Sequence, residues 1–183
     1  MFKNVWLELL ALFARIGARP EDTEEERLHK QLITATALMT GLAGFVWGLL
    51  YFSFGEWLPG LIPFAYGVIV YLNVLLFAIT GNVNLLRGVL LITLLLLPFL
   101  LMWSLGGFVL GSVVASWGML VPLIALLLTT PRNAFYWFLG FLALIILSAV
   151  IEPFLRTDNL LSPLVRDIFF VIDVGIPSSV IFV

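Results

Sequence analysis

The chain has 183 residues, of which 62% are hydrophobic and 11% are charged; its net charge is −2 and its mean hydropathy is +1.16. Soluble domains carry about 25% charged and about 45–50% apolar residues, so this composition excludes a soluble globular fold and makes lipid the solvent. The near-neutral, scattered charge excludes a nucleic-acid-binding surface, and the absence of cysteine excludes disulfides and thiolate catalysis.

Residues 1–19 are predicted to form an amphipathic helix that lies in the membrane interface. Apolar residues recur at helical spacing through this segment, whereas Glu8 and Arg15 fall elsewhere around the helix. These charges disfavour a membrane-spanning role, and Trp6 suits the depth of the lipid headgroups. A helix packed on a partner domain is the alternative.

Residues 20–31 form a charged juxtamembrane segment. Its acidic residues come first and its basic residues last, an order that favours a helix because it complements the helix macrodipole. We expect this segment to begin the first membrane-spanning helix in water.

Residues 32–183 are predicted to form a six-helix transmembrane domain, which makes the chain an all-α polytopic membrane protein. A helix of about 20 apolar residues crosses the hydrocarbon core. The loop at 152–163 is predicted to be solvated, with a lid or ligand site as the alternative. The six predicted spans are 32–54, 61–80, 88–105, 112–130, 135–151 and 164–183.

The basic residues predict the orientation. Seven of the nine Lys and Arg side chains lie in the N-terminal segment or in the second and fourth loops, and two lie around the last loop. Positively charged loops stay in the cytoplasm, so the N-terminus is predicted to be cytoplasmic. No Lys or Arg follows the last span, so we expect this sequence to be part of a longer chain; a terminus that is buried against a partner is the alternative.

Three polar or helix-bending residues are candidates for an intramembrane site. Asp173 is the acidic residue deep within a predicted span, where an ionisable group is costly and indicates a proton relay, a cation site or a ligand sensor. Hydrogen bonding within the bundle is the structural alternative. Pro177 removes the hydrogen bond to the carbonyl of Asp173 and is predicted to kink the last span, which favours a hinge. A proline that the membrane helix simply tolerates is the alternative. Asn73 is a further polar group within a span.

The small residues Gly44 and Gly48 form a GxxxG pattern in the first span. This pattern favours close helix packing, either inside the bundle or across a homodimer. No catalytic, cofactor-binding or metal-binding motif is present, and the single histidine excludes a haem with two histidine ligands from this chain.

Several segments between residues 24 and 183 carry a family resemblance: RLHKQL (27–32), WGLLYFSFGE (47–56), IPFAY (62–66) with Asn73, LLLLPFLLMWSLGGF (94–108), WGMLVPLIALL (117–127) and WFLGFLALIILSAVIEP (137–153). With these segments the chain resembles the six-helix membrane regions that precede class III adenylate and guanylate cyclase domains in bacteria; similar modules precede histidine kinases. The resemblance implies a membrane anchor, dimerising scaffold and receptor in a bacterial inner membrane, with cyclase activity in a parent protein and no catalytic residue in this chain.

Three functional hypotheses follow. The first is a membrane anchor and sensor module that passes a signal through its sixth helix to a cytoplasmic effector, as a homodimer. The second is a non-catalytic accessory subunit of a larger photosynthetic or respiratory membrane complex. The third is a small transporter or channel, which rests on Asp173 and on the expectation that Pro98 and Pro122 break their helices.

Overall fold

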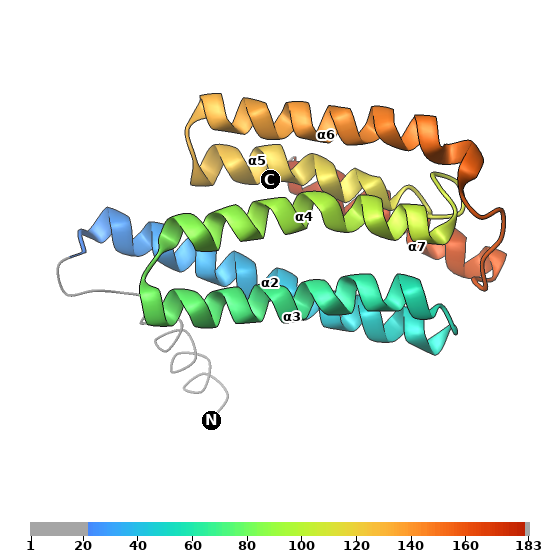
Figure 1. Cartoon of the computed structure of the whole chain (residues 1–183), viewed down its shortest axis with the longest axis horizontal. Helices are drawn as coiled ribbons and strands as arrows, with labels where there is room; N and C mark the ends of the chain where they lie inside the picture. Colours follow the sequence, from blue (N-terminus) through green and yellow to red (C-terminus); the bar gives the residue numbers. More distant parts are fainter. Residues whose placement is uncertain (1–21, 182–183) are drawn as a thin grey trace.

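The computed structural model describes residues 22–181, and the interfacial helix predicted at 1–19 lies outside this range. The described residues form helices and no strand (Figure 1). In chain order these are α2 (Glu24–Ser53), α3 (Trp57–Thr80), α4 (Val83–Leu105), the 3-10 helix η1 (Val114–Met119), α5 (Leu120–Leu128), α6 (Pro131–Ile151), the 3-10 helix η2 (Glu152–Phe154) and α7 (Pro163–Ile181).

The charged juxtamembrane segment starts α2. The Thr23 hydroxyl accepts from the Glu26 amide at 3.2 Å, and the Glu26 carboxylate accepts from the Thr23 amide at 2.9 Å. This reciprocal capping box satisfies amides that lack partners at a helix start. Lys30 also pairs with Asp22 at 2.7 Å across the start of the helix. The charged residues and the first predicted span therefore form one continuous helix.

The helices run back and forth along the long axis of the molecule. The connections α2–α3, α4–η1 and α6–α7 share one end of the bundle, and the connections α3–α4 and α5–α6 share the other end (Figure 1). At the second end, Nη1 of Arg87 donates to the carbonyl of Leu128 at 2.8 Å and so joins α4 to the end of α5. Residues 22–181 therefore make six lengthwise passes, the fourth of them built from η1 and α5.

The fourth pass differs from the single helix predicted over 112–130. Ser112 and Val113 have positive φ angles of 53° and 59°, which delay the start of regular helix. The pass then begins as η1, and Pro122 is the third residue of α5 rather than a residue of its interior. The prediction that Pro98 breaks its helix was also wrong, because α4 runs through this residue without interruption.

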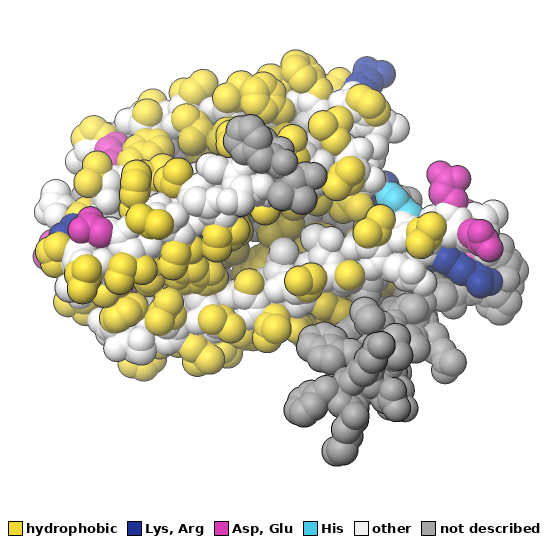
Figure 2. Space-filling model, turned by 180° about the vertical axis from the view of Figure 1, so that it is seen from behind, with side chains coloured by type: hydrophobic (Ala, Val, Ile, Leu, Met, Phe, Trp, Pro, Cys, Tyr) yellow, Lys and Arg dark blue, Asp and Glu magenta, His cyan; other side chains and the backbone are white. Residues whose placement is uncertain are grey.

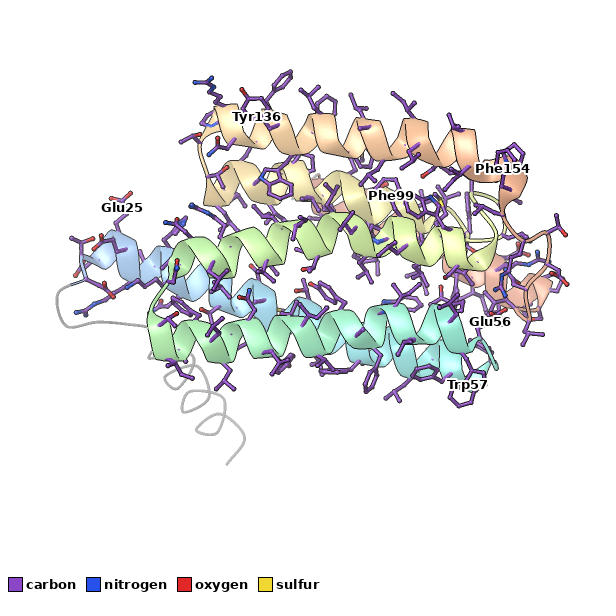
Figure 3. All side chains as sticks on the ribbon, in the orientation of Figure 1. Glu25, Glu56, Trp57, Phe99, Tyr136 and Phe154 are labelled. Atoms are coloured by element: carbon purple, nitrogen blue, oxygen red, sulfur yellow. The ribbon has the colours of Figure 1, made fainter. Side chains whose placement is uncertain are left out.

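In the part of the chain that the structure describes, four helices are long and apolar enough to cross a membrane: Glu24–Ser53, Trp57–Thr80, Val83–Leu105 and Pro131–Phe154. Only 11% of the apolar window of the last of these is buried inside the protein. Hydrophobic side chains also dominate the face in Figure 2, and Figure 3 shows side chains projecting outward along the bundle. An apolar exterior of this extent is the expected surface of a protein surrounded by lipid.

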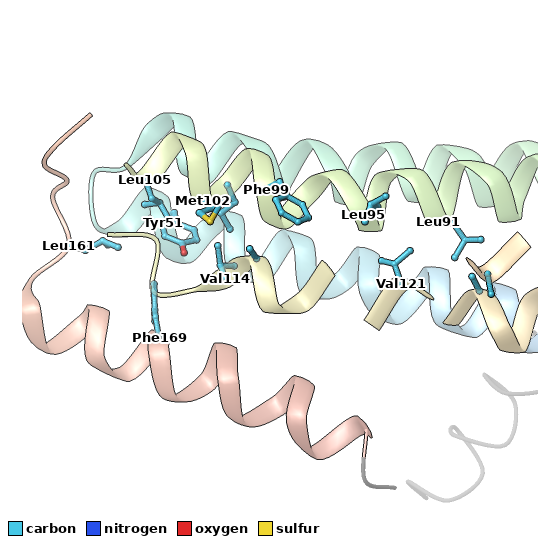
Figure 4. Packing of buried hydrophobic residues seen from close by; sticks show 14 residues of the cluster. Tyr51, Leu91, Leu95, Phe99, Met102, Leu105, Val114, Val121, Leu161 and Phe169 are labelled. Atoms are coloured by element: carbon cyan, nitrogen blue, oxygen red, sulfur yellow. The ribbon is translucent and has the colours of Figure 1, made fainter. Parts of the chain in front are cut away.

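Two buried hydrophobic clusters hold the passes together. One joins α2, α3 and α4, with Ile33, Val70 and Leu90 among its members. The other joins α2, α4, η1, α5, α6 and α7; Figure 4 shows Phe169 of α7 extending toward it. The second cluster is the hydrophobic contact that places α7 on the bundle.

Gly44 and Gly48 seat α2 directly on the backbone of α3. A Cβ at Gly44 would lie 2.7 Å from the carbonyl oxygen of Pro63, and one at Gly48 would lie 2.9 Å from that of Gly60. Both glycines therefore pack inside one bundle, which is the first of the two alternatives for the GxxxG pattern. By contrast, a Cβ at Gly88 of α4 would meet nothing within 4 Å.

We expect Gly44→Ala and Gly48→Ala to lower the free energy of unfolding by about 1–3 kcal/mol, because backbone atoms must move to admit the methyl group. Gly88→Ala is the matched control and should be neutral or stabilising, since alanine is the better helix former. Thermal unfolding in detergent measures the stability of the three purified variants. Equal melting temperatures for the Gly48 and Gly88 variants would contradict this packing.

Candidate functional site

The last helix, α7, meets the rest of the protein along one narrow stripe. Its buried side chains are Phe169, Asp173 and Pro177, spaced four residues apart and therefore on one helix face. The flanking apolar residues Val171 and Val174 are exposed. Asp173 lies in the middle of the stripe, so a carboxylate stands where α7 contacts the bundle.

Side chains of η1 donate one hydrogen bond to the carboxylate and one to the main-chain carbonyl of Asp173. The residue is 3% exposed, and the Trp117 indole N–H donates to its Oδ1 at 2.8 Å. The Ser116 hydroxyl donates to its main-chain carbonyl. Pro177 has no N–H to give that carbonyl, and Ser116 supplies the missing donor, as neighbouring helices do at prolines in membranes. The α-helix continues through Pro177 to Ile181.

A cavity of about 160 Å³ lies beside Asp173, between α2, α3, α4, the η1–α5 pass and α7. Asp173 is the one charged residue of its lining, which also includes Thr40, Trp47, Tyr51 and Trp117. The rest of the lining is glycine, proline and aliphatic side chains. The face in Figure 2 is hollowed between α7 and α2. The arrangement is an apolar chamber with one carboxylate.

Aromatic rings surround the first part of the stripe. The Phe169 ring stands edge-on to Trp47 at a centroid distance of 5.1 Å and to Tyr51 at 5.6 Å. Such edge-to-face pairs add to the stabilisation that burial provides. Because Trp47 and Tyr51 also line the cavity, the rings that dock α7 are part of the chamber wall.

The predicted candidates do not all meet at this chamber. Asp173 lines it, and so does Gly44 through its place on α2. Asn73 lies elsewhere: its side-chain amide donates to the carbonyl of Leu86 at 3.0 Å and joins α3 to α4. Gly48 packs on α3 outside the cavity lining. Asn73 is therefore a structural bridge, and the candidate site reduces to Asp173 and its surroundings.

A second group of polar side chains joins the three turns at one end of the bundle. The group, which we call the turn network, consists of Glu56, Glu152, Arg156 and Asn159. Glu56 is 2% exposed, pairs with Arg156 at 2.7 Å, and accepts from the Leu160 amide. Most residues of the loop at 152–163 are exposed, as expected for a solvated loop, but contacts to the buried Glu56 also hold this segment in place.

Two further contacts complete the turn network. Both carboxylate oxygens of Glu152 accept from the Phe108 amide, at 3.1 and 3.2 Å. The Asn159 amide donates to the carbonyls of Leu105 and Leu110, each at 3.1 Å. The turns α2–α3, α4–η1 and α6–α7 are thereby tied together, which fixes the start of α7.

The sequence reasoning missed Ser116, Trp117 and Glu56. A signal existed for Glu56, since it is a lone acid in a tight apolar turn. Trp117 and Ser116 carry no such signal, because their partner lies more than 50 residues away. Among residues 22–181 no three metal-ligating side chains gather at one point.

Comparison with known proteins finds no matching protein family, no matching curated protein and no matching solved structure.

We expect Arg156→Ala to lower the free energy of unfolding by about 1–3 kcal/mol, because it leaves the Glu56 carboxylate buried without its ionic partner. Asp158→Ala is the control, since Asp158 is an exposed acid in the same loop. Thermal unfolding of both variants and the wild type measures the difference. If Arg156→Ala and the wild type had the same melting temperature, the turn network would not hold the loop.

Proposed function

We propose that this chain is the membrane module of a bacterial signalling protein, with six transmembrane passes and a cytoplasmic N-terminus, which senses a ligand or a membrane state and transmits it through α7. The observation that carries this proposal is the placement of Asp173. This carboxylate lies both in the cavity lining and on the stripe by which α7 contacts the bundle. Occupation of the cavity and the position of the last helix are therefore linked through one residue.

Six passes require the segment Val114–Leu128 and α7 to cross the membrane together with the four longer helices. The segment Val114–Leu128 is apolar but short. In α7, Arg166 and Asp167 lie in the first turns, where charged groups can reach the interface. Asp173 lies deeper but is paired with Trp117. The alternating ends of the passes support this arrangement, because each pass reverses the direction of the one before it (Figure 1).

The distribution of basic residues supports the orientation. Arg87 and Arg132 belong to the end that holds the α3–α4 and α5–α6 connections, and Arg27 and Lys30 precede the apolar part of α2. Under the positive-inside rule this end faces the cytoplasm. The turn network then faces the outside, and α7 begins there and runs inward.

The mechanism is a shift between two positions of α7. A ligand changes this equilibrium only to the extent that it binds one position more tightly than the other. The turn network holds the start of α7, whereas Val180 in its last turn is exposed. Movement of α7 about its fixed start therefore has its largest amplitude at the cytoplasmic end, where an effector would receive it.

The effector class follows from the resemblance to bacterial cyclase membrane regions: a nucleotide cyclase, in a homodimer. Two other functions remain candidates. The outward face of α6 favours an accessory subunit whose apolar surface is covered by a larger complex. The carboxylate in the cavity favours a small transporter or channel.

The test is the intact mass of the native protein, followed by cyclic-nucleotide production from the purified full-length protein. We expect a mass well above the 20.4 kDa of this chain and activity that changes in Asp173→Asn, because the variant removes the charge that couples the cavity to α7. A mass of 20.4 kDa would contradict a covalent effector and favour the accessory subunit. Uptake into proteoliposomes that is lost in Asp173→Asn would favour the transporter.

A further inference from the structure

We propose that the cavity beside Asp173 binds a small protonated amine with an apolar body about the size of a benzene ring. The ammonium group would lie against the free oxygen of the Asp173 carboxylate, and the body would fill the apolar chamber. The role of this amine as the sensed ligand rests on the proposed function, but its binding to the cavity requires no effector.

The carboxylate has capacity for one more donor. Trp117 donates to Oδ1, and among the described residues no donor reaches Oδ2. A carboxylate in a low-dielectric interior is costly unless a cation pairs with it. Among residues 22–181, no Lys, Arg or His side chain lines the cavity. A cationic ligand would therefore supply the partner that these residues do not.

The aromatic lining favours an ammonium group in particular. Trp47, Tyr51 and Trp117 all line the chamber together with Asp173. Aromatic rings attract cations through the negative charge on their faces, and sites built from several rings recognise amines and quaternary ammonium groups. A carboxylate among three such rings combines both means of binding a cation in one place.

The volume and polarity of the chamber define the rest of the ligand. A cavity of about 150 Å³ lined by apolar side chains is known to hold benzene, and this one measures about 160 Å³. Leu97, Leu101 and Val121 form part of its apolar wall. Because the lining holds one anion and no cation, it disfavours fatty acids, phosphates and zwitterionic amino acids. Sugars are disfavoured because few hydrogen-bonding groups face the chamber.

Such a ligand would contact both sides of the α7 interface. Trp47 and Tyr51 belong to α2, Trp117 belongs to η1, and Asp173 belongs to α7. An ammonium group that draws Oδ2 toward the α2 rings would favour one position of α7. The same chemistry therefore provides both binding and the bias that a sensor requires.

The experiment is a titration of the full chain in lipid nanodiscs with benzylamine, followed by tryptophan fluorescence, with empty nanodiscs as the blank. Benzyl alcohol has the same shape without the charge. We expect saturable benzylamine binding and at least roughly tenfold weaker binding of benzyl alcohol, since truncating a buried ion pair costs that much or more. Equal affinity for the two compounds would overturn the proposal.

Variants locate the site. Asp173→Asn should weaken benzylamine binding by at least roughly tenfold, whereas Asp167→Asn, an exposed acid on the same helix, should leave it unchanged. Ala43→Phe adds a ring at an exposed residue of the cavity lining and should block binding while Asp173 remains. It therefore tests the site even if Asp173→Asn fails to fold. Unchanged binding in a folded Asp173→Asn or in Ala43→Phe would overturn the proposal.

The failure of this proposal and that of the proposed function are distinguishable. Benzylamine binding without any effect on cyclic-nucleotide production would contradict signalling by this ligand and leave the site in place. Regulated cyclase activity in a protein that binds neither compound would support the signalling module and overturn the amine site.

Discussion

The hydrogen bond from the Trp117 indole to the Asp173 carboxylate holds the last helix against the rest of the bundle. A carboxylate at this depth is costly unless it is paired, so the contact constrains where α7 can lie. Pro177 strengthens the constraint, because it frees the main-chain carbonyl of Asp173 for the Ser116 hydroxyl. Two neighbouring residues of η1 thus donate to one residue of α7, and the cavity lies directly beside them.

This contact acts together with the turn network at the start of α7. The buried Glu56 carboxylate, paired with the exposed Arg156, fixes the segment that leads into the helix, and Phe169 docks between rings of α2. Beyond Asp173, Pro177 is the one further buried side chain among those described on this helix. The helix is therefore held firmly at one end and lightly at the other, the arrangement that a movable output helix needs.

Sequence reasoning identified the helices well because membrane spans depend on composition, and a left-handed glycine such as Gly81 ends α3 where the sequence predicts. It misjudged the fourth pass, since nothing in the sequence around Ser112 indicates a positive φ. Asp173 was identifiable as an isolated acid in an apolar span. Its indole partner, like the pairing of Glu56 with Arg156, depends on tertiary contacts between distant residues that no local pattern encodes.

The central claim is that α7 crosses the membrane and delivers its end to the cytoplasm. A reporter fused after Val183 tests this most directly, in two versions: a fluorescent protein that matures only in the cytoplasm, and a phosphatase that is active only outside it. The account predicts fluorescence from the first fusion and no activity from the second. Phosphatase activity without fluorescence would place the end of α7 outside and contradict transmission to a cytoplasmic effector.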